Sequence, residues 1–119
     1  MFQSLFARQR ESRISLPDIS PQEAAQRMES SRPPLLIDVR TPQEFQNDGH
    51  IQGARLLPLA SLPLRMDEVP QDQPIVLVCR SGARSRVAGE RLVAAGYDEV
   101  FNLQGGMMRW RQAGLPVRH

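Results

Sequence analysis

The chain has 119 residues, of which 40% are hydrophobic and 24% charged, and this length and composition are typical of one compact globular domain. Its short apolar runs exclude a transmembrane helix, and its N-terminus lacks the hydrophobic stretch of a secretory signal, so we expect a cytoplasmic protein without a membrane span. All 15 strongly basic side chains are arginines, which excludes chemistry that requires a lysine, such as a Schiff base or a P-loop.

The formal net charge of +2 hides an asymmetry along the chain. Residues 1–73 hold 8 arginines against 10 acids, whereas residues 74–119 hold 7 arginines against 3 acids. Four of these seven arginines lie within thirteen residues of the single cysteine, Cys79. A positive field around one cysteine favours a small anionic substrate. Nucleic acid is not expected as a partner, because it would need a broader basic face with stacking aromatic residues.

The first segment of the chain carries few signals of regular structure. Residues 1–12 are interpreted as a flexible N-terminal tail that precedes one domain over residues 13–119. The helical spacing of the first apolar side chains leaves a short helix on a membrane surface or a partner as the alternative. Residues 13–19 alternate apolar and polar side chains and predict a short edge strand, since Pro17 is tolerated only at the edge of a sheet.

The next segment has an explicit helix start. Ser20 is the predicted N-cap, Pro21 suits the first helical position, and Glu23 is expected to close a capping box. The helix must end before Pro33, because the residue that precedes a proline disfavours helical geometry.

A continuous apolar run with one acid, residues 35–39, predicts a buried parallel strand. Thr41, Pro42 and Glu44 then repeat the helix-start pattern, so a second, short helix is expected to end by Gly49.

The middle of the chain contains the clearest strand. Residues 54–59 predict a short strand, and residues 60–66 predict a short helix that Pro63 disfavours. Residues 74–79 are apolar at every position after the first, which predicts a strand buried on both faces.

The clearest helix is predicted over residues 84–95. Val87, Leu92 and Val93 are expected on its inner side, and Gly96 has the C′ position that commonly ends a helix.

The C-terminal part of the chain predicts one more strand and one more helix. Residues 99–103 form the strand, and Gly105 and Gly106 form a turn into a helix that continues through Trp110. Strands thus alternate with helices throughout. This order predicts an α/β fold with an open, mainly parallel central sheet of about five strands and helices on both faces.

Cys79 follows the most apolar strand and precedes a short loop into the clearest helix. Ligands of open α/β sheets bind at the carboxyl ends of strands, and a tight turn into a helix N-terminus directs backbone N–H groups into one concavity. Gly82 permits the backbone angles of such a turn, while Arg80 and Arg84 add positive charge. We therefore expect a lowered pKa of the Cys79 thiol and a nucleophilic sulfur at the floor of an anion-binding bowl. The alternative is a buried strand-end cysteine with a packing role only.

Four motifs in order resemble the rhodanese family. The segment C-R-S-G-A-R-S at residues 79–85 resembles the active-site loop of the family, C-x-x-G-x-[RK]-[ST]. The others are D-V-R-x-x-x-E-F at 38–45, G-H-I-x-G-A at 49–54 and L-x-G-G-x-x-x-W-x-x-A-G-L-P at 103–116. The resemblance covers about residues 15–117 and implies a rhodanese-like fold.

The resemblance also implies a reaction. Cys79 would attack the outer sulfur of a donor such as thiosulfate, hold that sulfur as a persulfide, and pass it to cyanide or a thiol. No cofactor and no metal are implied. The chain has no second cysteine, so the acceptor thiol must come from outside, from a small molecule or a sulfur-relay protein. The residues that the resemblance assigns to binding of the donor and the persulfide are Arg80, Ser81, Gly82, Ala83, Arg84 and Ser85.

Other functions stay open at this point. The chain could relay sulfur inside a partner complex without turnover on thiosulfate. A phosphatase or an arsenate reductase of the same fold is disfavoured, because their loops resemble C-x5-R whereas Cys79 to Arg84 is C-x4-R. A catalytically inactive scaffold is disfavoured because the nucleophile is present.

Two polar positions outside the loop are given structural roles. Asp38 and Arg40 are expected to form a buried pair or to hold loops by hydrogen bonds, since a buried carboxylate needs such a partner. His50 is expected to be structural as well, because a thiolate that is already activated needs no general base.

Overall fold

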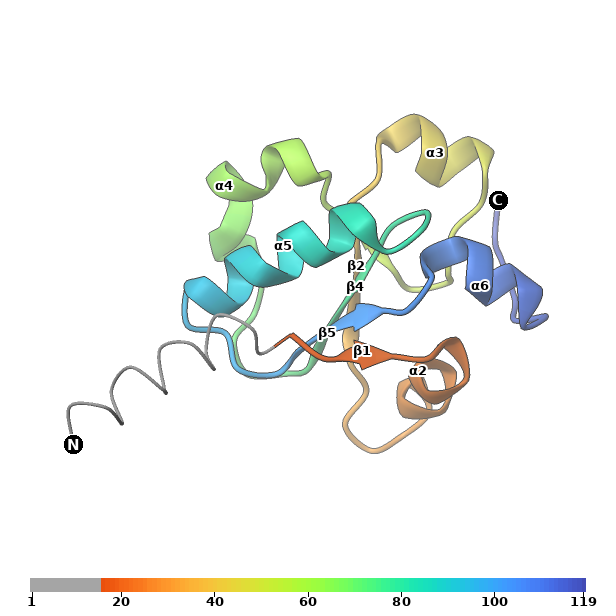
Figure 1. The fold of residues 1–119 in the computed structure, drawn as a ribbon, viewed down its shortest axis with the longest axis horizontal. Helices are drawn as coiled ribbons and strands as arrows, with labels where there is room; N and C mark the ends of the chain where they lie inside the picture. The colour runs from red at the N-terminus through yellow and green to blue at the C-terminus, as the bar shows by residue number, and fades with distance from the viewer. Residues whose placement is uncertain (1–15) are drawn as a thin grey trace.

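The computed structural model describes residues 16–119, which form a five-stranded sheet with helices on both faces (Figure 1). The predicted tail, residues 1–12, lies outside the described part. The strands are β1 (Asp18–Ile19), β2 (Leu35–Asp38), β3 (Arg55–Leu56), β4 (Ile75–Val78) and β5 (Val100–Leu103). The helices are α2 (Pro21–Met28), α3 (Pro42–Asn47), α4 (Leu62–Arg65), α5 (Ala83–Ala94) and α6 (Gly106–Gln112). None of the helices in this part of the chain is long and apolar enough to cross a membrane.

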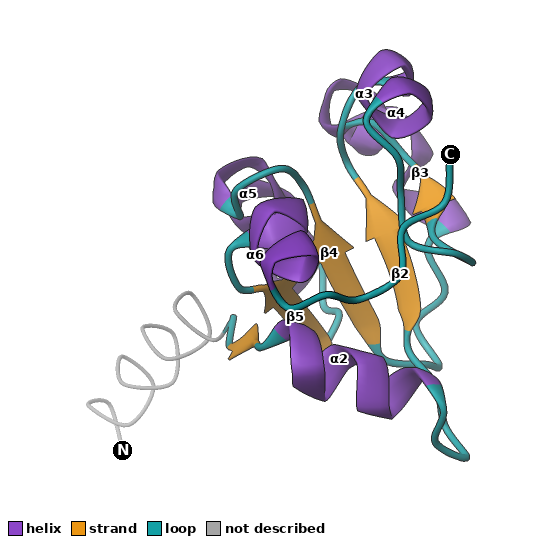
Figure 2. Cartoon of the chain, turned by 90° about the vertical axis from the view of Figure 1, so that its right-hand side faces the viewer, coloured by secondary structure: helices purple, strands orange, loops and turns teal. Residues whose placement is uncertain are grey.

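All neighbouring strands are parallel, in the order β1-β5-β4-β2-β3 (Figure 2). The prediction of an open parallel α/β sheet is therefore confirmed. The two edge strands have only two residues each and are shorter than predicted over 13–19 and 54–59. Pro17 and Pro58 have no backbone N–H group, so neither can donate a hydrogen bond that would extend the ladder. Residues 13–15 of the predicted first strand lie outside the described part.

Two apolar cores lie on the two faces of the sheet. β4 contributes to both, because successive side chains of a strand point to opposite faces. Ile75 and Leu77 pack in the core under α4 and α5, whereas Val76 and Val78 pack in the core with α2 and α6. Helices on both faces thus bury a sheet that is apolar on both faces, as the run at 74–79 predicts.

Of the two predicted capping boxes, one is confirmed and the other forms only in part. Thr41 and Glu44 form the complete capping box before α3. Ser20 caps α2 by accepting a hydrogen bond from the Glu23 backbone N–H at 3.1 Å. The second predicted bond, from the Ser20 backbone N–H to the Glu23 carboxylate, is wrong, because that carboxylate accepts from Arg27 at 2.6 Å instead. An i,i+4 ion pair on the same helix has replaced the second half of the box.

The inner side of α5 also differs from the prediction. Val87 was expected to face the sheet, but it is 40% exposed. The buried row is Ser85, Ala88 and Leu92, which have the three- and four-residue spacing of one helix face. Val87 lies about 200° around the helix from Ser85, so the same geometry turns it to the solvent.

Candidate active site

Cys79 lies at the carboxyl end of β4, in the middle of the sheet. The cysteine is 1% exposed, and only residues 80–82 separate it from the first residue of α5, Ala83. Gly82 has a φ of 105°, a left-handed conformation that glycine adopts without steric cost. This glycine lets the chain reverse so sharply that the first turn of α5 faces back toward the cysteine.

Donors from the loop and the helix surround the sulfur. The Gly82 backbone N–H donates to Cys79 Sγ at 3.1 Å, and the Ser85 hydroxyl lies 3.3 Å from the same atom. Burial by itself raises the pKa of the Cys79 thiol, but hydrogen bonds from the Ser85 hydroxyl and from the amides of Ser85, Gly82 and Ser81 outweigh it. The net pKa lies below the ordinary value, which favours the thiolate.

The two arginines nearest in sequence to Cys79 differ in their environment. Arg84 forms a bidentate ion pair with Glu44 of α3, with both N–O distances 2.8 Å. Its charge still acts on the Cys79 sulfur, but both arms of its guanidinium are engaged by the carboxylate. Arg80 is exposed and forms no ion pair within residues 16–119. Glu44, which sequence reasoning took for a helix cap only, therefore also orients a residue of the loop.

A buried ion pair lies beside the site at the end of β2. Asp38 and Arg40 are 0% and 1% exposed, and Arg40 Nη2 and Nε bind the carboxylate oxygens at 2.7 and 2.9 Å. The same guanidinium donates to the carbonyl of Gly49 at 2.9 Å. Asp38 is in register with Val78, the residue before Cys79. The pair thus joins the end of β2 to the loop after α3.

The N-terminus of α6 supports the loop from behind. The backbone N–H of Met107 donates to the carbonyl of Cys79 at 2.9 Å, and that of Met108 donates to the carbonyl of Arg80 at 3.1 Å. Gly106 has a φ of 58°, and a Cβ at this position would overlap both carbonyl groups. A glycine is therefore required for α6 to approach the loop this closely.

Sequence reasoning missed one buried polar side chain, Asn102 of β5, which is 2% exposed. It accepts from the Ser85 hydroxyl at 2.6 Å and donates to the carbonyl of Gly82 at 3.1 Å. It also donates to the carboxylate of Asp18 at 3.3 Å. The available signal was one amide in an otherwise apolar strand, but the sequence does not show that this strand pairs with β4.

His50 has a structural environment. Its ring stacks on that of Phe45 with a centroid distance of 3.7 Å, and its Nδ1 lies 2.9 Å from the Phe45 carbonyl oxygen. No hydrogen bond joins it to Cys79 within residues 16–119. The same part of the chain contains no group of three or more side chains that could hold a metal ion.

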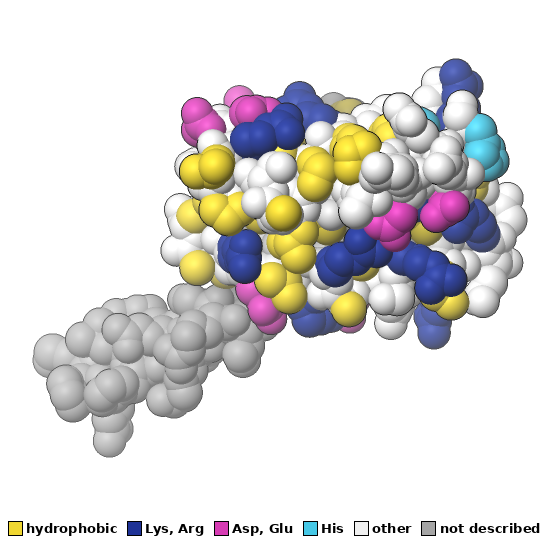
Figure 3. Space-filling view, turned by 90° about the horizontal axis from the view of Figure 1, so that it is seen from above, with side chains coloured by type: hydrophobic (Ala, Val, Ile, Leu, Met, Phe, Trp, Pro, Cys, Tyr) yellow, Lys and Arg dark blue, Asp and Glu magenta, His cyan; other side chains and the backbone are white. Residues whose placement is uncertain are grey.

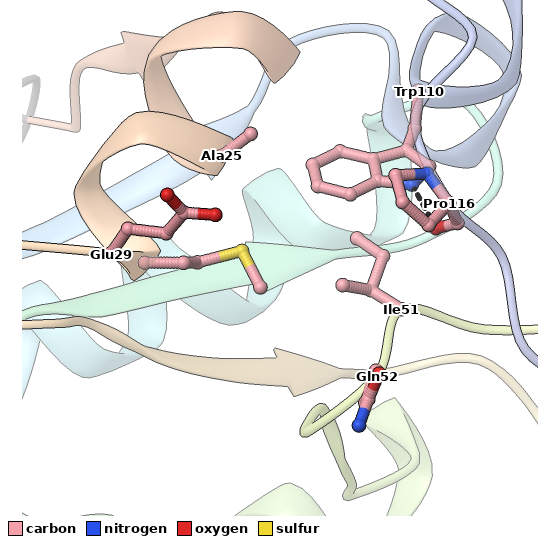
Figure 4. Close-up of a pocket in the computed structure, with 7 residues that line it drawn as sticks. Ala25, Glu29, Ile51, Gln52, Trp110 and Pro116 are labelled. Carbon is pink, nitrogen blue, oxygen red and sulfur yellow. Dashed lines mark hydrogen bonds between the residues drawn. The ribbon is translucent and has the colours of Figure 1, made fainter.

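Several hollows mark the surface of the described part, and two of them lie on opposite faces of the sheet. One, of about 350 Å³, is next to the site. Its lining includes Leu59, Arg84 and Arg91. On the face over α3, α4 and α5, apolar side chains gather in the middle, with basic and acidic side chains around them (Figure 3). The other, of about 300 Å³, lies between α2 and α6, where the Trp110 indole N–H donates to the Pro116 carbonyl at 2.8 Å (Figure 4). The first of these two includes Arg84 of the loop, and a further hollow, of about 420 Å³, is lined by Ser81, Gly82 and Ala83 of the loop and by Asn102.

Comparisons with known proteins agree on one family. The model of the rhodanese-like domain family matches residues 20–113. A protein of Allochromatium vinosum named sulfurtransferase is 42% identical over 100 residues, which cover 84% of this chain and 92% of that protein. Thiosulfate sulfurtransferase GlpE of Vibrio cholerae is 36% identical over 94 residues, with 79% and 88% covered.

Solved structures show the same likeness. A rhodanese-like domain protein from Staphylococcus aureus superposes with a TM-score of 0.76 at 31% identity, covering 87% of this chain and 100% of that one. A thiosulfate sulfurtransferase from Pseudomonas aeruginosa superposes with a TM-score of 0.80 at 26% identity. In that case 92% of this chain matches 21% of the other protein.

Proposed function

This chain belongs to the rhodanese-like domain family, and from that premise we propose that it is a sulfurtransferase whose nucleophile is Cys79. The donor is thiosulfate or another sulfane-sulfur compound, and the acceptor is cyanide or an external thiol. Residues 80–85 bind the donor and the persulfide through their backbone amides and the Ser85 hydroxyl. Asp38 and Arg40 hold the neighbouring strand ends in place.

The reaction proceeds in two displacements. The Cys79 thiolate attacks the outer sulfur of thiosulfate, a new S–S bond forms, and sulfite leaves with the electron pair of the broken bond. The enzyme then carries a persulfide. Cyanide attacks the terminal sulfur, thiocyanate leaves, and the thiolate of Cys79 is regenerated. A thiol acceptor takes the same sulfur as a new persulfide, again without any external oxidant or reductant.

The observation that carries the proposal is the set of donors on the sulfur. The Gly82 amide and the Ser85 hydroxyl lie 3.1 and 3.3 Å from Sγ; the amide is fixed by the backbone, and the hydroxyl is buried in the first turn of α5. Donors in such positions stabilise a thiolate before the reaction and an anionic terminal sulfur after it. A cysteine with a packing role only has no need of them.

Two features support sulfur rather than phosphate as the transferred group. The loop from Cys79 to Arg84 has the shorter C-x4-R spacing. In addition, the guanidinium of Arg84 is engaged by Glu44 through both arms, so its fork is not free to hold the oxygens of a phosphoryl group on the Cys79 sulfur.

The proposal is tested by intact-protein mass spectrometry after incubation with thiosulfate. We expect the wild type to gain one sulfur atom, cyanide to remove it, and Cys79→Ser to gain none. No gain in a wild-type protein whose Cys79 still reacts with an alkylating reagent would reject thiosulfate as donor. Rapid uptake from a protein persulfide with no uptake from thiosulfate would instead identify a sulfur-relay module.

A further inference from the structure

The only amide side chain on β5, Asn102, contacts both groups that donate to the Cys79 sulfur. Its Oδ1 accepts from the Ser85 hydroxyl at 2.6 Å, and its Nδ2 donates to the carbonyl of Gly82 at 3.1 Å. Gly82 and Ser85 are the residues whose N–H and O–H groups reach Sγ. One buried carboxamide thus spans the loop and the first turn of α5 and holds them at a fixed separation.

The orientation of this carboxamide is determined by its partners. Asp18 is in register with Asn102 across the β1–β5 ladder, and its ionised carboxylate can only accept hydrogen bonds. The Gly82 carbonyl can only accept as well. The NH₂ group must therefore face these two oxygens, and Oδ1 must face Ser85. The short edge strand β1 thereby gives the carboxamide its direction.

The Ser85 hydroxyl has one proton and two neighbours that can take it. Oγ lies 2.6 Å from Asn102 Oδ1 and 3.3 Å from Cys79 Sγ. While Cys79 is a thiol, its S–H can donate to Oγ and Ser85 can donate to Asn102. When the sulfur is an anion, Asn102 Oδ1 and the sulfur compete for the one proton of Ser85.

We propose that Asn102 is a positioning residue for Cys79: it holds the Gly82 loop against the sulfur and sets how strongly Ser85 donates to it. Only the predicted effect on sulfur transfer rests on the proposed function; the predicted effect on the alkylation of Cys79 does not. The charged groups around the network are the Asp18–Arg86 pair, the Arg84–Glu44 pair, the Asp38–Arg40 pair and the exposed Arg80. Of these, Asp18 alone hydrogen bonds Asn102 within the described residues.

The test is the pH dependence of the alkylation rate of Cys79 by iodoacetamide. In Asn102→Asp the new carboxylate accepts the Ser85 proton more strongly, loses the donor to the Gly82 carbonyl, and adds negative charge near the sulfur. All three effects disfavour the thiolate. We expect the midpoint of the alkylation profile to rise by about one pH unit, and persulfide formation below that midpoint to slow about tenfold.

Two further variants separate positioning from folding. Asp18→Asn combined with Asn102→Asp restores a donor between the two side chains and removes their repulsion, so the double variant should recover thermal stability while its alkylation midpoint stays high. The matched control is Asn47→Asp, the same change at the exposed second asparagine of the chain, for which we expect the wild-type midpoint. A double variant that is folded and has the wild-type midpoint would overturn the proposal.

A double-mutant cycle gives a second measurement if the aspartate variants do not fold. Asn102→Leu should change the alkylation midpoint less in a Ser85→Ala background than in the wild type, because part of its effect acts through the Ser85 hydroxyl. Equal changes in both backgrounds would contradict the proposed coupling. Alkylation needs no sulfur donor, so these results stand apart from the mass-spectrometric test of the proposed function.

Discussion

Four buried polar side chains lie in or beside the candidate site. Asp38, Arg40, Ser85 and Asn102 are at most 2% exposed, and every buried side-chain nitrogen or oxygen in the described part of the chain has a hydrogen-bond partner. A buried donor or acceptor that loses its partner costs about 1–3 kcal/mol, and a charged one costs more. These four side chains are for this reason important for stability.

The Asp38–Arg40 pair gives a prediction at this scale. Asp38→Asn retains the shape of the side chain but leaves the charge of Arg40 buried and unpaired. We expect a loss of about 3–5 kcal/mol in the free energy of unfolding, measured by urea denaturation at neutral pH. Replacing both residues with apolar side chains of similar volume should recover much of this loss. A loss below about 1 kcal/mol in Asp38→Asn would contradict the prediction and show that water reaches the pair.

At the scale of elements, the Arg84–Glu44 pair joins α5 to α3 across the loop. The hydrogen bond from Arg84, opposed by partial burial, lowers the pKa of the Glu44 carboxyl from 4.5 to about 2. A lowered folded-state pKa means that the pair stabilises the protein above about pH 4.5 and that this contribution is lost as the pH falls toward 2. Since 38% of the Arg84 side chain is exposed, solvent screening limits the contribution to about 1 kcal/mol.

We therefore expect Glu44→Gln to be less stable than the wild type at pH 7, with a difference that shrinks steadily below about pH 4.5. Urea denaturation at a series of pH values measures it. The control is Glu99→Gln, which breaks the more exposed bidentate pair with Arg32 and should have a smaller effect. A difference between Glu44→Gln and wild type that is constant from pH 7 to pH 3 would contradict the role given to the ion pair.

The sequence was informative where local signals decide the structure. The capping box at Thr41 and Glu44 and the apolar run at 74–79 predicted α3 and β4, and the glycine after Cys79 predicted the sharp turn. The errors came from interactions between distant segments or from competing local ones. Glu23 found Arg27 as a partner, and no pattern along the chain shows that Asn102 lies under the loop, because a parallel strand pairing brings it there.

At the scale of the whole molecule, the net positive charge is concentrated in the C-terminal segment of the chain, which contains Cys79. Residues 74–119 carry 7 arginines against 3 acids, while the whole chain has a net charge of only +2. A local positive field raises the concentration of anions at the site, and salt screens it over about 10 Å at 0.1 M ionic strength.

This asymmetry predicts a charge effect on the reactivity of Cys79. Iodoacetate is an anion, whereas iodoacetamide is neutral. At low salt we therefore expect the ratio of the iodoacetate rate to the iodoacetamide rate to be higher for Cys79 than for a small free thiol. The ratio of the two rates should fall several-fold between about 10 mM and 500 mM salt, because the Debye length shrinks from about 30 Å to a few ångströms. A ratio that does not depend on salt would show that the arginines are too far from the sulfur, or too fully paired, to attract a donor.

The order of the strands has a consequence for colloidal behaviour. The segment Ile75–Val78 is short, branched, uncharged and free of proline, which is the composition that forms amyloid-type zippers when it is exposed. In the folded protein it is the central strand, hydrogen bonded on both sides, while the two edges of the sheet offer only two residues each for pairing with another molecule. The strand that ends next to Cys79 is thus also the strand that folding sequesters most completely from self-association.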